Sequence, residues 1–109
     1  MSSEEFKDLA LSFPGCIARP HFNRTAFKVE RKRIFATLLE ENDSANILLS
    51  LPEQEIFCKM DDAINAIPNK WGAHGWTTFE FKKLERAVIL EALSSAYQDV
   101  LNKSKIKNK

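Results

Sequence analysis

The spacing of apolar residues changes from helical to alternating and back to helical along this chain. Near the N-terminus four apolar residues share one helical face: Phe6, Leu9, Ala10 and Phe13. Ser2 and Glu5 have the spacing of a capping box, in which each side chain accepts a hydrogen bond from the other residue's backbone N–H. Pro14 and Gly15 do not continue a helix. The pattern predicts a first helix over about 3–13.

From residue 18 to residue 51 apolar and polar side chains alternate, which is the period of a strand with one buried face. Three turn-like segments interrupt the alternation: Asn23-Arg24, Glu30–Arg33 and Asn42–Ser44. The pattern predicts four strands of an antiparallel meander, over 19–22, 25–30, 34–40 and 46–51. In the first two strands, Phe22 and Phe27 are expected to face the core.

The C-terminal half returns to helical spacing, with one strand between two helices. Pro52 and Glu53 suit the first turn of a short helix, 61–75 is expected to be irregular, and 76–81 is predicted to be a fifth strand. A final helix is predicted over 84–103, followed by a flexible basic tail over 103–109. The buried side of that helix would consist of Ile89, Leu93, Ala96, Tyr97, Val100 and Leu101.

Helices at both ends of a run of strands predict a single α+β domain over 1–109. We expect an antiparallel sheet of about five strands, with the N-terminal and C-terminal helices packed on one face and a short middle helix beside them. The other face of the sheet is then open to water or to a partner. A chain of 109 residues has the size of one domain and is long enough to bury its own core.

Composition narrows the classes of function. Hydrophobic residues make up 44% of the chain and charged residues 28%, which is typical of a soluble globular protein. No apolar run approaches the roughly 20 residues that span a bilayer. The N-terminus also lacks the pattern of a secretion signal. We therefore expect a cytoplasmic protein without a membrane partner.

Residues suited to catalysis or metal binding are few. The cysteines and histidines are Cys16, Cys58, His21 and His74, which match no zinc spacing and predict no disulfide. The chain also lacks a glycine-rich phosphate loop and a nucleophile elbow. Cys16 would be a candidate thiolate only with His21 or His74 within hydrogen-bond reach. We therefore expect no enzyme activity, no cofactor and no metal site.

Charge is partitioned along the chain, although the formal net charge is only +1. Residues 19–33 carry six basic side chains against Glu30, a net charge of +5, whereas residues 34–68 carry seven acidic side chains against Lys59, a net charge of −6. A local basic stretch favours contact with a polyanion without making the whole surface adhesive. The acidic residues at 40–43 and 61–62 are interpreted as solvated turn charges rather than as a cation site.

Alternation would place several of these basic side chains on the open face of the sheet. Arg19, His21 and Lys28 alternate with apolar residues that are expected to face inward. Trp76 would lie on the same face, where an exposed indole can stack on a base. The complete set of predicted nucleic-acid-binding residues is Arg19, His21, Arg24, Lys28, Arg31, Lys32, Arg33, Lys70 and Trp76.

These residues and their neighbours also have purely structural interpretations. A basic turn is commonly a solvated hairpin, and a bulge after Gly75 would return Trp76 to the core. Trp71 is interpreted as a packing residue that anchors the irregular loop. His21 and His74 are interpreted as hydrogen-bonded structural histidines.

Six ordered segments between about 6 and 103 carry a family resemblance. They are Ser-Phe-Pro-Gly at 12–15, Ala-Phe-Lys-Val at 26–29, Ile-Phe-Ala at 34–36, Leu-Leu-Ser-Leu-Pro-Glu at 48–53, the stretch from Asn69 to Phe79, and Ser95-Ala96-Tyr97 with Val100. In this order they resemble the MmcQ/YjbR-like family. The resemblance implies a small bacterial domain with a frataxin-like (CyaY-like) arrangement of helices on an antiparallel sheet. It also implies DNA binding, often described as a double-wing arrangement.

The chain departs from that family at one turn. Where such proteins often have a Gly-Lys turn after the second strand, this chain has Arg31-Lys32-Arg33, and the extra charge favours phosphate contact. The leading hypothesis is therefore a non-enzymatic module that binds DNA or RNA with weak sequence preference.

Two other hypotheses stay open. One is a protein-interaction adaptor that uses the open sheet face around Trp71 and Trp76. The other is a small-ligand or catalytic pocket under 68–76. It would require a cleft that holds His74 together with Cys16 or Asp61.

Overall fold

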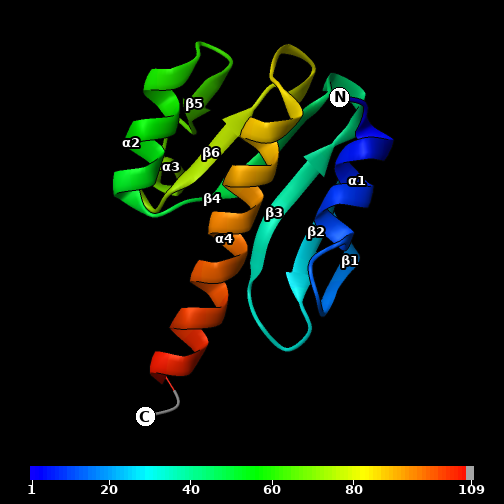
Figure 1. Cartoon of the computed structure of the whole chain (residues 1–109), viewed down its shortest axis with the longest axis vertical. Helices are drawn as coiled ribbons and strands as arrows, with labels where there is room; N and C mark the ends of the chain where they lie inside the picture. Colours follow the sequence, from blue (N-terminus) through cyan, green and yellow to red (C-terminus); the bar gives the residue numbers. More distant parts are fainter. Residues whose placement is uncertain (108–109) are drawn as a thin grey trace.

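The computed structural model describes the backbone of residues 1–107 and the side chains of residues 1–102. Its centre is a six-stranded antiparallel sheet in the order β1-β2-β3-β4-β6-β5 (Figure 1). The strands are β1 (Cys16–His21), β2 (Arg24–Val29), β3 (Ile34–Leu39), β4 (Ser44–Leu48), β5 (Ile64–Ala66) and β6 (Trp76–Phe79). The helices are α1 (Ser3–Leu11), α2 (Leu51–Met60), α3 (Lys70–Ala73) and α4 (Arg86–Lys107), with short 3-10 turns η1 (Glu40–Asn42) and η2 (Phe81–Lys83).

Helices α1, α2 and α4 pack on one face of this sheet, and each meets it through an aromatic pair (Figure 1). The ring centroids are 5.9 Å apart for Phe6 and Phe27, 5.9 Å for Phe57 and Phe79, and 6.0 Å for Tyr97 and Phe35. All three pairs are edge-to-face, the geometry that the ring quadrupoles favour. The predicted α+β class is confirmed.

A bulge in β3 adds one large side chain to the core. Phe27 pairs with Ala36 and Lys28 pairs with Ile34, so Phe35 is an extra residue opposite β2. Phe35 and Ala36 are both fully buried in the main hydrophobic cluster. Strict alternation would have sent one of these two neighbours to the opposite face.

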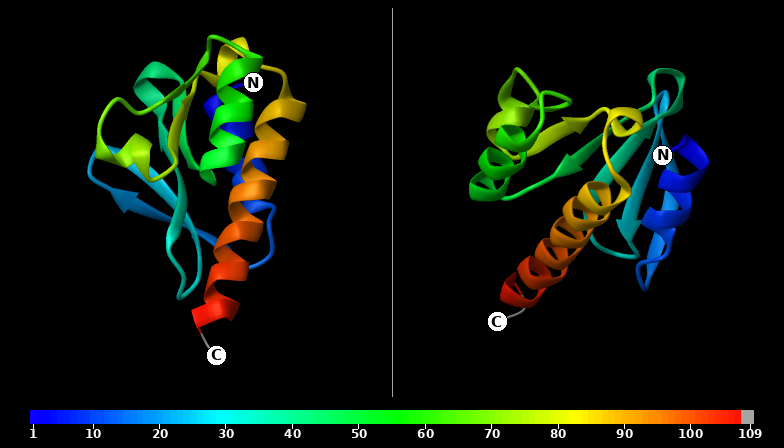
Figure 2. Two further views of the ribbon diagram at one scale, coloured as in Figure 1. Left: turned by 90° about the vertical axis from the view of Figure 1, so that its left-hand side faces the viewer. Right: turned by 45° about the horizontal axis from the view of Figure 1, so that its top comes forward.

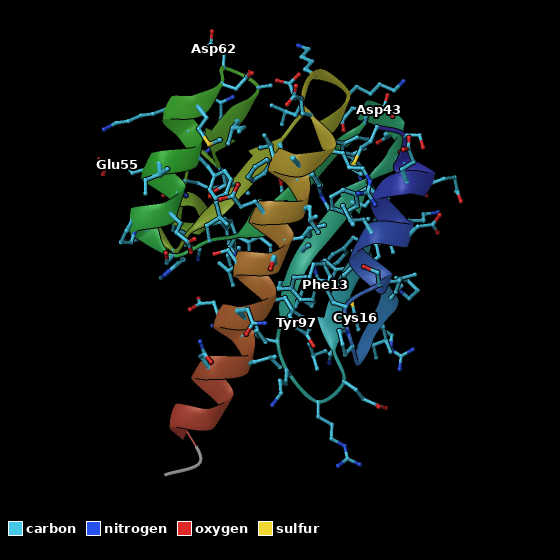
Figure 3. The ribbon with its side chains drawn as sticks, in the orientation of Figure 1. Phe13, Cys16, Asp43, Glu55, Asp62 and Tyr97 are labelled. Carbon is cyan, nitrogen blue, oxygen red and sulfur yellow. The ribbon has the colours of Figure 1, made fainter. Side chains whose placement is uncertain are left out.

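Helix α4 forms hydrogen bonds with two distant parts of the chain, the segment after α1 and the start of α2. The Tyr97 hydroxyl donates to the carbonyl oxygen of Pro14 at 2.6 Å, and its ring lies 5.0 Å from the ring of Phe13 (Figure 3). Two residues earlier, the Ser95 hydroxyl donates to the carboxylate of Glu53 in the first turn of α2. These contacts join three of the segments that carry the family resemblance, because 12–15, 48–53 and 95–97 meet through them.

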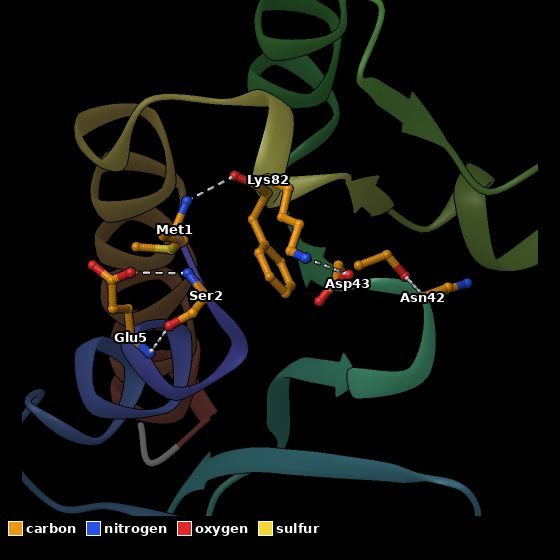
Figure 4. Close-up of polar contacts among 8 residues, drawn as sticks. Met1, Ser2, Glu5, Asn42, Asp43 and Lys82 are labelled. Carbon is orange, nitrogen blue, oxygen red and sulfur yellow. Dashed lines mark hydrogen bonds and ion pairs between the residues drawn. The ribbon is translucent and has the colours of Figure 1, made fainter.

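The start of the chain and the η1 turn are held by charge and capping. The predicted capping box is confirmed: Ser2 N donates to Glu5 Oε1 at 2.9 Å and Glu5 N donates to Ser2 Oγ at 3.1 Å (Figure 4). Lys82 Nζ lies 3.2 Å from Asp43 Oδ2, and Lys7 Nζ lies 3.4 Å from Glu40 Oε1. Two of the acids at 40–43 are therefore ion-paired with lysines.

The segment 61–75 differs most from the sequence prediction. It was expected to be irregular, but it contains one strand that was not predicted, β5, and the short helix α3. The expected count of about five strands is therefore too low. A three-residue edge strand and a four-residue helix are too short for apolar periodicity to reveal.

Several predicted boundaries also move. The first hairpin turn is Phe22-Asn23 rather than Asn23-Arg24, and the strand predicted over 76–81 ends at Phe79. Leu51 begins α2 instead of ending a strand. The helix predicted over 3–13 ends at Leu11, and the one predicted over 84–103 runs from Arg86 to Lys107. The predicted flexible basic tail lies outside the described side chains.

Candidate functional site

Polar and basic side chains occupy the face of the sheet opposite α1, α2 and α4. Strand pairing forms one row across five strands: Arg19, Ala26, Thr37, Asn46 and Thr78. Alternation adds His21, Arg24, Lys28 and Trp76 to this face, together with Ser44 and the apolar residues Ile17, Leu39 and Leu48. The six strands of the described chain contain no Asp or Glu. This uncovered face is therefore cationic, with no carboxylate of its own.

The uncovered face is hollowed into a groove of about 230 Å³. In Figure 2, left, the β1–β2 hairpin and the segment around α3 both extend on the side of the sheet away from α4. They form the two sides of the groove, and β3 and β4 form its floor. Its lining residues are His21, Arg24, Thr37, Asn46, Ile67, Trp71 and Trp76.

The segment that carries Trp71 is fixed by close backbone packing. A β-carbon on Gly72 would lie 1.8 Å from the Ile67 carbonyl oxygen, and one on Gly75 would lie 1.9 Å from the Leu49 carbonyl oxygen. Only glycine permits both approaches. The segment that carries Trp71 therefore packs directly against the backbone of Ile67 and Leu49.

Side chains from two other elements hold the same segment. The Asn69 side chain accepts from the backbone N–H of Trp71 at 2.9 Å and so caps α3. From α2, Gln54 Nε2 donates to the Gly72 carbonyl oxygen at 2.9 Å and to Thr77 Oγ1 at 3.1 Å. Trp71 thus projects from a supported loop although 53% of its surface is exposed.

Two polar side chains in the groove have donors without protein acceptors. The Thr78 hydroxyl donates to Asn46 Oδ1 at 2.7 Å, which turns the Asn46 amide group away from Thr78. No described residue accepts from that amide. Nη1 of Arg24 is buried and has no hydrogen-bond partner among the described residues. The same burial lowers the pKa of the Arg24 guanidinium, which nevertheless stays protonated in proteins. The Asn46 amide is open to an acceptor on a ligand, whereas Arg24 Nη1 is shielded from solvent.

The tip of the β1–β2 hairpin corrects the prediction for Phe22. That side chain was expected to face the core, but it is 94% exposed and lies in the turn. Its backbone φ is +58°, a left-handed conformation that costs a non-glycine residue about 1–2 kcal/mol. Its ring meets the ring of His21 edge-on, with centroids 5.0 Å apart. An exposed aromatic side chain in a strained turn is a position suited to contact with a partner.

The structure gathers some of the predicted site residues and separates others. His21, Arg24 and Trp76 line the groove, and Arg19 and Lys28 lie on the same sheet face. Lys70 stands at the rim, with Nζ 5.7 Å from the centre of the Trp71 indole. The turn residues Arg31, Lys32 and Arg33 lie at the opposite end of β2.

The predicted basic residues of 19–33 keep their charges free of ion pairs. Within the described part of the chain, none of them has a carboxylate within 4.0 Å. The ion pairs involve four other lysines instead: Lys7, Lys59, Lys82 and Lys83. Asp43, Glu55 and Asp62 lie in the half of the molecule away from the β2–β3 turn (Figures 1 and 3). The basic turn Arg31–Arg33 is thus not interleaved with these three acids.

Sequence reasoning missed part of the groove. Thr37, Asn46 and Ile67 were not predicted as site residues, and Trp71 was interpreted as a packing residue although it is half exposed and lines the groove. One signal was available for Asn46, which is a polar residue between the apolar residues Ala45 and Ile47. Its position opposite Thr37 and Thr78 depends on register, which one strand's sequence does not reveal.

The geometry does not assemble the predicted catalytic alternatives. The groove lining includes neither His74, Cys16 nor Asp61. Burial raises the pKa of the Cys16 thiol, the opposite of what an activated nucleophile needs. The described residues contain no group of three His, Cys, Asp or Glu side chains that could hold a metal ion. No helix among them is long and apolar enough to cross a membrane.

Comparison with known proteins finds no relative. No protein-family model, curated protein or solved structure matches the chain. The resemblance to the MmcQ/YjbR-like family therefore stays a prediction, and the function has to be argued from the groove and the charged face themselves.

Proposed function

We propose that this protein is a non-enzymatic module that binds nucleic acid through the uncovered face of its sheet. The observation that supports the proposal is the charge of that face. Arg19, Arg24 and Lys28 project from strands that contain no acid, and none of the three has an ion-pair partner among the described residues. Free basic groups along a surface displace counterions from phosphates, which favours binding of a polyanion.

The length of the surface suits a chain of phosphates rather than a single anion. Arg24 begins β2 and Arg31 lies in the turn after its end, so the length of β2, about 17 Å at roughly 3.3 Å per residue, separates them. Neighbouring phosphates on one strand of duplex DNA are spaced about 3.4 Å along the helix axis. The groove end and the Arg31–Arg33 turn would therefore contact different phosphates of one bound molecule.

The finer parts of the family prediction belong to the same proposal. A frataxin-like arrangement, membership of the MmcQ/YjbR-like family and a place in the bacterial cytoplasm all agree with a small DNA-binding domain. The separate positions of the hairpin tip and the β2–β3 turn on one sheet are compatible with a double-wing arrangement.

Titration of labelled oligonucleotides tests the proposal directly. Fluorescence anisotropy would be measured with single-stranded and duplex DNA at about 50 mM and about 200 mM salt. We expect binding at the lower salt that weakens steeply at the higher salt. Poly-glutamate of matched charge is the control, because it offers negative charge without bases or phosphates. Negligible binding of both DNA forms at both salt concentrations would rule the function out.

A protein-interaction adaptor remains the second candidate because two large aromatic side chains are exposed. Phe22 is 94% and Trp71 is 53% exposed, and both lie at the rim of the same groove face. Purification of the tagged protein with and without nuclease separates the two functions. A partner protein that stays bound after nuclease and high salt, together with no DNA binding in the titration, would favour the adaptor.

A further inference from the structure

We propose that the groove binds one unpaired, carbonyl-bearing base of a single-stranded nucleic acid, with Trp71 and Trp76 stacking on it and Asn46 donating to its edge. This assignment rests on the proposed function and names the form of nucleic acid that the site selects. It uses the hollow in the sheet face, whereas the general function needs only the basic surface around it.

The size and walls of the groove fit a flat ring system. Its volume is about 230 Å³, smaller than the roughly 300–1,000 Å³ of pockets that enclose drug-sized ligands. Trp71, Trp76 and Ile67 supply apolar walls, and the two indoles make no ring contact with each other in the described part of the chain. Indoles in such a position stack on any base, because every base has a π-face.

The polar groups of the groove are biased toward donors. Asn46 Oδ1 is engaged by the Thr78 hydroxyl, which leaves the amide hydrogens for a ligand. In the usual bidentate contact of asparagine with adenine, the adenine amino group would have to share that oxygen with the Thr78 hydroxyl, which already occupies one of its two lone pairs. A carbonyl group on thymine, uracil, guanine or cytosine instead accepts from the amide. The groove therefore disfavours adenine.

The Arg24 guanidinium is placed for the phosphate beside that base. Its side chain lines the groove and has no ion-pair partner among the described residues. Lys70 adds a second cation at the rim, 5.7 Å from the Trp71 ring. Cations beside an aromatic platform are the usual arrangement in proteins that bind single strands.

A paired base cannot enter this groove without leaving its duplex. Stacking on an indole needs the face of the base, which a neighbouring base pair covers in a double helix. Single strands, loops and flipped-out bases expose that face. The groove thus selects single strands, while the basic turn at the far end of β2 contacts phosphates of either form.

Tryptophan fluorescence reports on this site alone, because the chain contains two tryptophans and both line the groove. The ligands are a ten-residue thymidine oligomer, the equivalent adenine oligomer, a duplex of the same length and free thymidine monophosphate. We expect quenching by the thymidine oligomer at the lowest concentration. Equal quenching by the adenine oligomer or the duplex would overturn the proposal. So would free thymidine monophosphate acting as strongly as the oligomer, which would indicate a small-ligand site.

Substitutions then separate this site from the general function. Trp71→Ala should weaken binding of the thymidine oligomer about 5- to 140-fold, the range that base stacking implies. Trp71→Phe should restore part of that loss. Asn46→Asp keeps the acceptor for Thr78 but replaces the donors by a negative charge, and Asn46→Leu removes the donors without adding charge, so both should also weaken binding. Ile56→Ala, an exposed apolar residue on α2, is the matched control and should have no effect.

Two results distinguish the failures. Circular dichroism must first show that Trp71→Ala and Asn46→Asp fold like the unmodified protein. If both variants then bind the oligomer as tightly as the unmodified protein, the proposed base site is wrong and the charged surface alone binds DNA. If the unmodified protein binds neither strand form at low salt, the proposed function itself fails.

Discussion

The most informative perturbation removes the basic turn between β2 and β3. The triple variant R31A/K32A/R33A deletes three cations that have no ion-pair partner among the described residues. Arg31 and Arg33 are exposed, and the turn retains its backbone hydrogen bond from Lys32 N to the Val29 carbonyl oxygen, 2.9 Å long. The fold should therefore survive, and any change in DNA binding reports on phosphate contacts.

The size of the effect follows from counterion release. Each phosphate contact contributes about 0.7 to the slope of log affinity against log salt for single strands and about 0.9 for duplex DNA. Loss of three contacts should flatten the slope by about 2.1 or about 2.7. Between about 50 mM and about 200 mM salt, the variant should then lose about 18-fold less affinity for single strands than the unmodified protein, and about 42-fold less for duplex DNA.

A second triple variant provides the control for net charge. K59A/K82A/K83A removes the same number of positive charges, so both variants shift the formal net charge from +1 to −2. Each of these lysines faces a carboxylate at 3.1–3.2 Å and belongs to α2 or η2 rather than to the sheet. Anisotropy titrations at several salt concentrations measure all three proteins. An unchanged slope in R31A/K32A/R33A, or equal flattening in the control, would refute the assignment of phosphate contacts to the turn.

Three further predictions concern the scaffold. Gly75→Ala should lower the free energy of unfolding, measured by urea denaturation, by more than about 2 kcal/mol, because φ is +109° and the new β-carbon would meet the Leu49 carbonyl oxygen. Gly15→Ala is the control: its β-carbon would have its nearest atom at 3.5 Å, so only the positive φ should cost stability, about 1–2 kcal/mol. Phe22→Gly should leave the unfolding free energy within about 1 kcal/mol while weakening DNA binding; a larger loss of stability would show that Phe22 serves the fold. Burial raises the pKa of the Cys16 thiol above its ordinary value, so its contribution to the free energy of unfolding is complete below that ordinary value and is lost as pH rises through the folded-state pKa. The free energy of unfolding should therefore fall with rising alkaline pH, less steeply in Cys16→Ala, and an equal slope in both proteins would contradict this.

The sequence predicted correctly those elements that are stabilised by contacts between residues close together in the chain. The capping box at Ser2 and Glu5 lies within one helical turn, and the apolar residues of β2 through β4 lie close together in each strand, where β3 is buried from Phe35 to Leu39. Both patterns can be read from neighbours in sequence. The resulting α+β class and the helix-covered face therefore followed from the sequence.

The groove depends on contacts that no local pattern contains. Trp71 is exposed because Gly72 and Gly75 seat its loop on the backbone of Ile67 and Leu49, and Gln54 reaches that loop from α2. A tryptophan in a glycine-rich loop can be either buried or exposed, and the sequence prediction took the commoner outcome, burial. Tertiary contacts of the loop leave Trp71 half exposed instead.

The turn at Phe22 shows how function and local preference diverge on this surface. A two-residue hairpin turn with positive φ at its first position favours glycine, yet the chain carries a bulky aromatic residue there. That choice gains no burial, since the ring is almost fully exposed, and it carries a conformational cost. Beside it, Arg24 keeps a buried donor without a partner among the described residues. Phe22 and Arg24 thus each lower the stability of the fold, and both lie beside the groove. Local loss of stability of this kind is typical of residues that serve ligand binding.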